Sequence, residues 1–211
     1  MKQKTWMCTI LCGIAALSLN AQDLERRERM EAGVKAGVNI SNVWDSKGNE
    51  FSADPKTGLA AGVFVGIPIG KFIGIQPEIL LSQKGFTGSG SLLSFPYTVS
   101  RTTTYLDVPL QLQLKPAEFI TFLGGPQFSY LLNQKDKYTF DNNSTEQEQE
   151  FNNDNIRKNI LGFVAGVDLL YQHFVLSGRV GWDFQTNAGD GSSLTPRYKN
   201  QWLQFTAGIK I

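Results

Sequence analysis

The sequence predicts an all-β protein: an eight-stranded antiparallel up-and-down transmembrane β-barrel with long extracellular loops and short periplasmic turns. Three observations predict this fold. Apolar and polar residues alternate along eight segments, which is the period of a strand with two different faces. The connections between the segments are long and short in strict alternation, and the apolar face carries almost no charge.

The alternation is clearest in TYLDVPLQLQLKP, Thr104 to Pro116, which has leucine or valine at every even position from Leu106 to Leu114. Tyrosine, aspartate, proline and glutamine occupy the odd positions between them. Similar alternation predicts strands at residues 33–43, 59–69, 72–83, 102–114, 119–132, 160–170, 174–184 and 201–211.

The connections differ in length according to the end of the array from which they emerge. Long connections are predicted over residues 44–58, 84–101, 133–159 and 185–200, and short ones over 70–71, 115–118 and 171–173. In an up-and-down array, all the long connections then lie at one end. Outer-membrane barrels have this arrangement, with the long loops outside the cell.

The uncharged apolar face is predicted to contact lipid, because a basic residue at the membrane midplane costs about 2–4 kcal/mol. A soluble lipocalin-like barrel also alternates, but its solvated face would be rich in Lys and Glu. The polar face here is mostly Gly, Ser, Thr, Gln and Asn, which suits a narrow lumen. The predicted lipid-facing residues include Leu106, Val108, Leu110, Leu112, Val180, Leu203 and Phe205.

Charged residues of both signs occur on the predicted inner face. They are Lys35, Glu78, Asp107, Asp168, Arg179, Asp183 and Lys210. These groups could form either an ion path or a plug of paired polar side chains. Eight strands leave an interior just wide enough for side chains, so the plug is favoured, and unpaired buried charges would be costly.

Prolines inside strands remove hydrogen-bond donors that a closed barrel needs. Pro77, Pro109 and Pro126 all lie within predicted strands. We expect a bulge or gap in the backbone pairing at Pro77 and Pro109.

The N-terminus has the layout of a secretory signal peptide, with Lys2 and Lys4 before an apolar run from Trp6 to Leu19. The predicted organisation is a signal peptide at 1–21, a short periplasmic segment at 22–31 and a barrel domain at 32–211. Without its first 21 residues the chain loses two lysines, leaving 18 basic and 19 acidic residues. This balance excludes a strongly basic nucleic-acid-binding protein.

No residue pattern indicates catalysis, a metal or a cofactor. His173 is the only histidine and lies in a predicted periplasmic turn, and both cysteines, Cys8 and Cys12, lie in the predicted signal peptide. A zinc site and a nucleophile–base pair are therefore not expected. The second long connection contains the apolar stretch LLSFPY, whose Leu92, Leu93, Phe95 and Tyr97 either contact a ligand or pack over the barrel mouth.

Several motifs resemble the PorT-like outer membrane β-barrel family of Bacteroidota, a porin-like family. They are GVKAGVNISNV (33–43), IQPEILLSQKGF (75–86), TYLDVPLQLQLKP (104–116), GGPQFSYLL (124–132) and FTAGIKI (205–211). The resemblance covers residues 32–211 and implies an eight-stranded barrel in the outer membrane. One relative is linked to a secretion system that exports gliding and virulence proteins.

The expected function is therefore a non-enzymatic barrel in the cell outer membrane that displays its loops for binding, adhesion or envelope integrity. The alternative is a narrow, porin-like channel or an accessory component of a protein secretion system. The expected partners are outer-membrane lipid and the barrel assembly machinery, with a surface ligand or secretion-system proteins as candidates.

Overall fold

The computed structural model describes residues 26–45, 53–92, 95–140, 143–149, 157–187 and 198–211. The signal peptide predicted at 1–21 and the predicted contact residue Leu93 lie outside these ranges. Within them, one 3₁₀ turn, Arg26–Glu28, precedes the strands β1 (Glu31–Asp45), β2 (Ala53–Pro68), β3 (Ile73–Leu92), β4 (Phe95–Ala117), β5 (Ile120–Phe140), β6 (Asn143–Gln149), β7 (Asn159–Tyr171), β8 (Phe174–Asp183) and β9 (Tyr198–Lys210).

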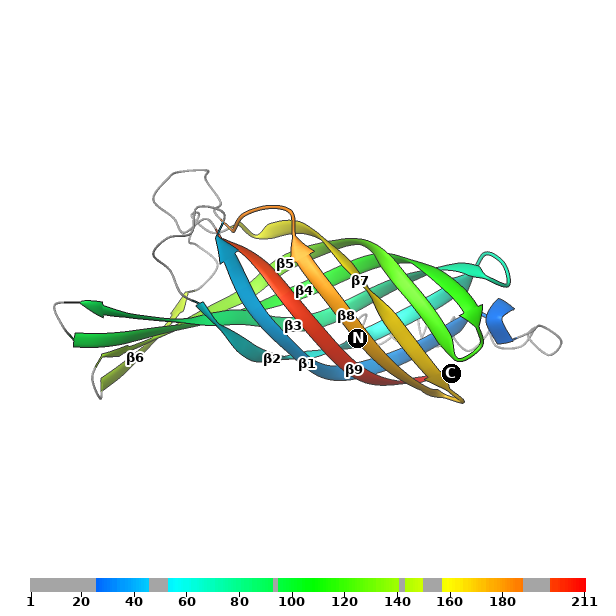
Figure 1. Ribbon diagram of the computed structural model, residues 1–211, viewed down its shortest axis with the longest axis horizontal. Helices are drawn as coiled ribbons and strands as arrows, with labels where there is room; N and C mark the ends of the chain where they lie inside the picture. Colours follow the sequence, from blue (N-terminus) through cyan, green and yellow to red (C-terminus); the bar gives the residue numbers. More distant parts are fainter. Residues whose placement is uncertain (1–25, 46–52, 93–94, 141–142, 150–156, 188–197) are drawn as a thin grey trace, which may run out of the picture.

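Eight of these strands form a closed antiparallel barrel. The strands follow the order β4-β3-β2-β1-β9-β8-β7-β5, and β4 pairs with β5 to close the ring. The ring appears in Figure 1 as a tilted array of strands that wraps around a single axis. The predicted eight-stranded barrel is confirmed.

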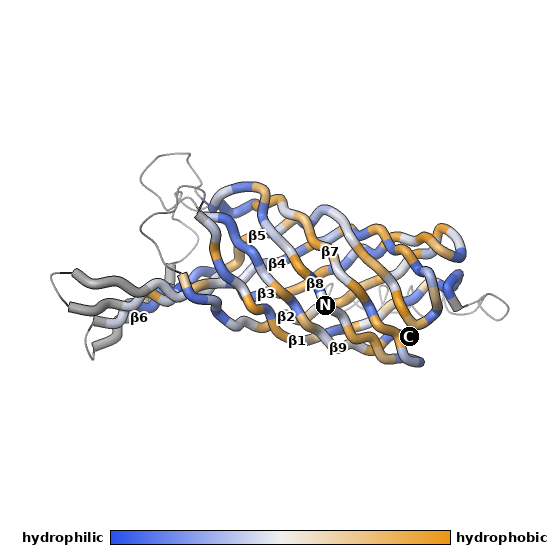
Figure 2. The backbone as a smooth tube through the Cα atoms, viewed as in Figure 1, coloured by the Kyte–Doolittle hydropathy of each residue, from blue (hydrophilic) through white to orange (hydrophobic). Residues whose placement is uncertain are grey.

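Side chains alternate between the two faces of the wall, as the sequence period requires. In β8 and β9 nearly every second residue is buried and the intervening ones are exposed. Figure 2 shows hydrophobic positions alternating with paler ones along the barrel strands. Many large apolar side chains are thus exposed on the outside, whereas polar side chains dominate the buried set.

Three strands continue well beyond the barrel. β3, β4 and β5 have 20, 23 and 21 residues, although a tilted strand crosses a membrane with about 9–11 residues. β6 pairs with the end of β5, from Gln134↔Gln149 to Phe140↔Asn143. The resulting four-stranded projecting sheet, made of β6 and the outer halves of β3, β4 and β5, extends to the left in Figure 1.

Two of the long connections predicted from the sequence are partly β-strand in the structure. Much of residues 84–101 and 133–159 was expected to be irregular, yet pairing continues through Leu92↔Phe95 in one hairpin and Phe140↔Asn143 in the other. Beyond the membrane, a strand needs no apolar outer face. The hydrophobic alternation therefore fades while the backbone pairing persists.

Backbone pairing is interrupted at two of the strand prolines. In the β3–β4 pair the register passes from Pro77↔Leu110 directly to Leu80↔Asp107. In the β4–β5 pair it passes from Pro109↔Gln127 to Leu112↔Gly124. The predicted gap is confirmed, and the register on its two sides is unchanged.

A bulge in β5 reverses the expected facing of its outer half. Thr104 pairs with Asn133 and Tyr105 pairs with Leu131, so Leu132 is an extra residue. Leu131 keeps the inward odd parity of Ser129 and is buried, whereas beyond the bulge the even-numbered Gln134 and Asp136 are the buried residues. The strand predicted at 119–132 ends at this bulge, and the alternation of the sequence carries no signal of the change.

Replacing Leu110 with arginine tests which medium surrounds the barrel. Leu110 is 52% exposed, so the change would be nearly neutral in water. In hydrocarbon it should destabilise the folded barrel by about 2–4 kcal/mol. Urea unfolding in liposomes measures the difference, with Asn133→Arg, exposed beyond the bulge, as the control. Equal stability of the two variants would contradict a lipid-facing Leu110.

Candidate functional site

The central lumen contains a chain of ion pairs around Glu78. Lys35 Nζ lies 2.5 Å from Glu78 Oε2, and Arg179 Nη2 lies 3.7 Å from Glu78 Oε1. Arg179 also contacts Asp168, with 2.7 Å between Nη1 and Oδ1. All four side chains are buried, so each charge needs its partners.

A second ion pair lies closer to the projecting sheet. Lys84 Nζ is 3.1 Å from Asp107 Oδ2 and 3.7 Å from the centre of the Trp202 ring. The Tyr105 ring lies 5.0 Å from the same ammonium group. The cation thus has a carboxylate and two aromatic rings around it, an arrangement that stabilises a buried charge.

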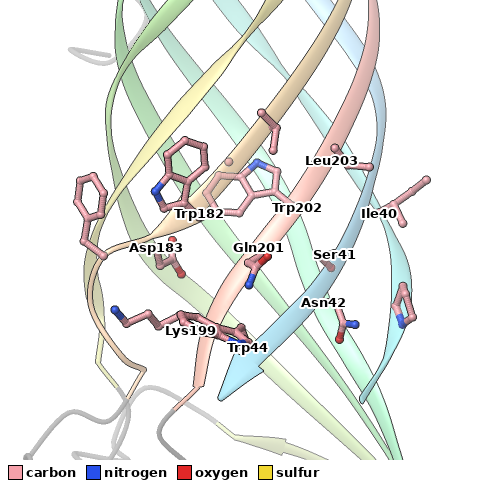
Figure 3. Close-up of a pocket in the computed structure, with 14 residues that line it drawn as sticks. Ile40, Ser41, Asn42, Trp44, Trp182, Asp183, Lys199, Gln201, Trp202 and Leu203 are labelled. Carbon is pink, nitrogen blue, oxygen red and sulfur yellow. The ribbon is translucent and has the colours of Figure 1, made fainter. Parts of the chain in front are cut away.

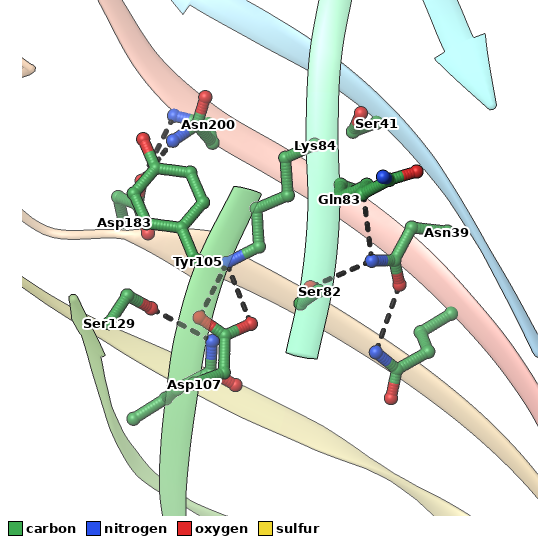
Figure 4. Close-up of polar contacts among 12 residues, drawn as sticks. Asn39, Ser41, Ser82, Gln83, Lys84, Tyr105, Asp107, Ser129, Asp183 and Asn200 are labelled. Atoms are coloured by element: carbon green, nitrogen blue, oxygen red, sulfur yellow. Dashed lines mark hydrogen bonds and ion pairs between the residues drawn. The ribbon is translucent and has the colours of Figure 1, made fainter. Parts of the chain in front are cut away.

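Neutral amides connect the strands around these two clusters. Asn39 donates a hydrogen bond of 2.8 Å to Ser82 and accepts one of 2.9 Å from Gln204. Asp183 accepts a hydrogen bond of 2.7 Å from the Asn200 side chain. Figure 4 shows how these groups point toward one another inside the wall. Polar side chains from β1, β3, β8 and β9 therefore form hydrogen bonds with one another inside the lumen.

One glycine makes room for the largest inner side chain. Gly181 and Trp202 are register partners on β8 and β9. A Cβ atom on Gly181 would lie 2.2 Å from the Trp202 ring. The small residue therefore provides the space that the indole fills above Lys84.

The lumen is also filled where it meets the projecting sheet. Arg101 donates two hydrogen bonds of 2.7 Å to Asp136 and one of 2.9 Å to the Tyr198 hydroxyl. These three hydrogen bonds satisfy the guanidinium of Arg101 and offset the cost of burying its charge. The Phe86 ring packs edge-on against Tyr198, with 5.2 Å between the ring centres.

The opposite mouth is covered by the first residue of β1 and the 3₁₀ turn that precedes it. Lys210 pairs with Glu31, and Lys115 donates a hydrogen bond to the backbone carbonyl of Arg27. The Arg27 guanidinium lies 5.1 Å from the Phe72 ring. The cavity next to Arg27, Glu31, Lys115 and Lys210 measures about 20 Å³, roughly the size of one water molecule.

The seven charged residues predicted on the inner face are all buried inside the barrel. They do not form one network. Lys35, Glu78, Asp168 and Arg179 belong to the central chain of ion pairs, whereas Asp107, Asp183 and Lys210 have separate partners.

Several charged partners were missed. Glu31 was placed in the periplasmic segment, Lys84 and Arg101 in one loop, and Asp136 in another. The inward side chains of β3 are at even-numbered positions, and this alternation continues to Lys84. Extending the predicted strand by one residue would therefore have placed Lys84 in the lumen. The bulge at Leu132 concealed Asp136.

The residues predicted to face lipid lie on the outside of the wall. Val108, Leu110, Leu112, Val180, Leu203 and Phe205 are exposed, and Leu106 is half-buried. Of the predicted contact residues, Leu92 closes β3 while Phe95 and Tyr97 begin β4, at the tip of the projecting sheet. His173 is exposed in the β7–β8 turn.

The model of the outer membrane protein beta-barrel domain family matches residues 20–186. The chain belongs to this family. It is therefore a protein of the outer membrane, and lipid surrounds its barrel. In such barrels the short turns face the periplasm, so the projecting sheet lies outside the cell. Among the described residues, no helix is long and apolar enough to span a membrane.

A known structure has the same fold. Ail, the attachment invasion locus protein of Yersinia pestis, shares 13% identity over 86% of this chain and 98% of its own, with a TM-score of 0.51. Ail in complex with the heparin analogue sucrose octasulfate shares 13% identity over 86% of this chain and 99% of its own, with a TM-score of 0.47. Neisserial surface protein A shares 10% identity over 85% of this chain and 97% of its own, with a TM-score of 0.45. No curated protein sequence matches the chain.

The Lys84–Asp107 pair provides a test of the filled lumen. Lys84→Met should leave Asp107 without its ionic partner and destabilise the barrel by about 3–5 kcal/mol. Adding Asp107→Asn should recover most of that loss, because the second charge is then gone. Urea unfolding of the single and double variants measures both steps. A double variant no more stable than Lys84→Met would show that the pair does not act as a unit.

Proposed function

We propose that this chain is a non-enzymatic outer-membrane anchor that displays a β-sheet at the cell surface for binding extended polypeptides. The observation that carries the proposal is the continuation of β3, β4 and β5 far beyond the barrel, with β6 added at one side. Beyond its last pair with β2, Ala53↔Gly88, β3 continues and stays paired with β4 as far as Leu92↔Phe95.

The free edge of β6 supports a role in binding. β6 is the last strand in the sheet order, and within the described part of the chain only β5 pairs with it. Its outer N–H and C=O groups can therefore pair with another strand, as in recognition by strand addition. The two glutamates of the β6 sequence, NSTEQEQ, are register partners of Lys137 and Lys135 on β5, so backbone pairing rather than charge would provide the affinity at this edge.

The filled lumen argues against the alternative of a narrow channel. A solute would have to pass the Glu78 cluster, the Lys84–Asp107 pair and the side chains that cover the periplasmic mouth. Opening such a path would separate buried charges from their partners, which is costly. The narrow interior supports an anchoring role for the barrel.

The proposal also includes membership of the PorT-like family and export of the chain to the outer membrane. The motifs at 33–43, 75–86 and 104–116 support the PorT-like family, and that resemblance is the only support for a secretion role. Cleavage of a signal peptide at 1–21 and insertion by the barrel assembly machinery would bring the chain to its membrane. Co-purification from outer membranes would identify secretion components if the secretion role is correct.

Binding of a designed peptide tests the free edge. We expect an alternating lysine–valine decapeptide to bind the purified protein, because it is soluble and carries a full set of backbone donors. An alternating lysine–proline decapeptide keeps the charge and loses many donors, so it should bind at least about tenfold more weakly. Fluorescence anisotropy measures both affinities. Equal binding of the two peptides would contradict strand addition.

Proline substitution in β6 supplies the matching variants. Adjacent residues in a strand direct their N–H groups to opposite sides. Of Thr145→Pro and Glu146→Pro, one should therefore remove a donor at the free edge while the hairpin with β5 stays paired. That variant should lose peptide binding and keep the stability of the wild type in urea.

Conductance separates the anchor from the channel. We expect planar bilayers that contain the purified protein to show no stepwise current, with a known porin as the positive control. Reproducible single-channel steps from the folded protein would replace the anchor proposal by the channel alternative.

A further inference from the structure

A groove lies on the outer face of β1, β8 and β9 near their extracellular ends. Its volume is about 590 Å³, within the usual range for ligand sites of about 300–1,000 Å³. Figure 3 shows the side chains that line it. The outward-facing members that matter most are Ile40, Trp44, Val180, Trp182, Lys199 and Leu203.

The polarity of the groove changes along the strands. Each row of register partners across β1, β9 and β8 forms one rung of the sheet. The lowest rung of the groove, Ile40↔Leu203↔Val180, is entirely apolar, and these side chains are 40%, 46% and 43% exposed. The next rung, Asn42↔Gln201↔Trp182, adds two amides and an indole N–H. The uppermost pair, Trp44↔Lys199, adds a second indole and an ammonium group. Hydrocarbon contact thus gives way to hydrogen-bond donors within three rungs.

Lys199 is the charged group of this surface. Among the side chains described on β1, β8 and β9, it is the only charged one that alternation directs outwards. No ion pair of Lys199 occurs within the described part of the chain. A lysine at the margin of the membrane can place its stem along apolar neighbours and its ammonium at headgroup level.

The wall below the groove can accommodate an acyl chain. A second, strongly apolar groove of about 590 Å³ lies on the same three strands and β7, nearer the membrane centre. It includes the small residues Ala36, Ala207 and Gly178, which leave the outer surface low between Leu176 and Phe205. The apolar surface therefore continues from the upper groove toward the middle of the bilayer.

We propose that this surface binds one outer-leaflet lipid that carries a phosphorylated headgroup. Its acyl chain lies over the Ile40 rung and the low wall beneath it. Its phosphate accepts hydrogen bonds from the Lys199 ammonium and the indole N–H groups of Trp44 and Trp182. Two features select this occupant: the surface is continuous with the lipid-contacting wall, and its single charge is complementary to a phosphate.

Lipid A and its enzymatically dephosphorylated form are the probes. Each is added to the full chain in dodecyl maltoside, and native mass spectrometry measures the bound fraction. The wild type should bind lipid A about tenfold more tightly than the dephosphorylated form, which corresponds to one charge-assisted contact. Lys199→Gln should abolish most of that preference, whereas Lys71→Gln at the periplasmic turn should preserve it.

A second variant tests the groove itself. Val180→Trp should fill the apolar rung and weaken the binding of both lipids, while the urea stability of the barrel stays near the wild-type value. The proposal is overturned if the wild type binds the two lipids equally, or if Lys199→Gln keeps the preference. It is also overturned if dimers of the protein form on this face and displace the lipid. None of these outcomes depends on the β6 edge, so the proposed function is tested separately.

Discussion

Hydrocarbon offers no hydrogen-bond partner to a peptide group, and this constraint governs the whole molecule. A sheet inside the membrane must close on itself, which β4 and β5 accomplish by pairing. Outside the membrane the constraint no longer applies. There the strands can continue as an open sheet, and β6 can present an edge to water. β3, β4 and β5 thus belong to a closed barrel in the membrane and to an open sheet in water.

Closure with eight strands leaves little interior space, so the inner face must fill the lumen and satisfy its own charges. The ion pairs around Glu78 and the Lys84–Asp107 pair meet that requirement. Trp202 fits above Lys84 because its neighbour Gly181 has no side chain. Recognition must then take place on the surface: at the projecting sheet outside the cell, and on the outer wall where β1, β8 and β9 meet the membrane margin.

Hydrophobic alternation predicted the barrel because it arises where one face of each strand contacts lipid. It carries no information about strands outside the membrane. It located all eight wall strands and the inward parity of Glu78 and Arg179. It could not find the outer half of β4 or β6, because outside the membrane neither face of a strand needs to be apolar. The bulge at Leu132 reverses parity without a sequence signal. Pairing partners such as Lys84 and Asp107 depend on the register between strands, which a single sequence does not contain.

The central claim is that the even-numbered side chains of β4 from Leu106 to Leu114 touch hydrocarbon. Spin labels at single cysteines from 106 to 114, on a background without Cys8 and Cys12, measure this directly in liposomes. Labels at 108, 110 and 112 should relax strongly with oxygen, which partitions into lipid, and weakly with a water-soluble nickel complex. Labels at 107 and 111 should be shielded from oxygen by comparison. Strong relaxation by nickel at the even positions would contradict the account.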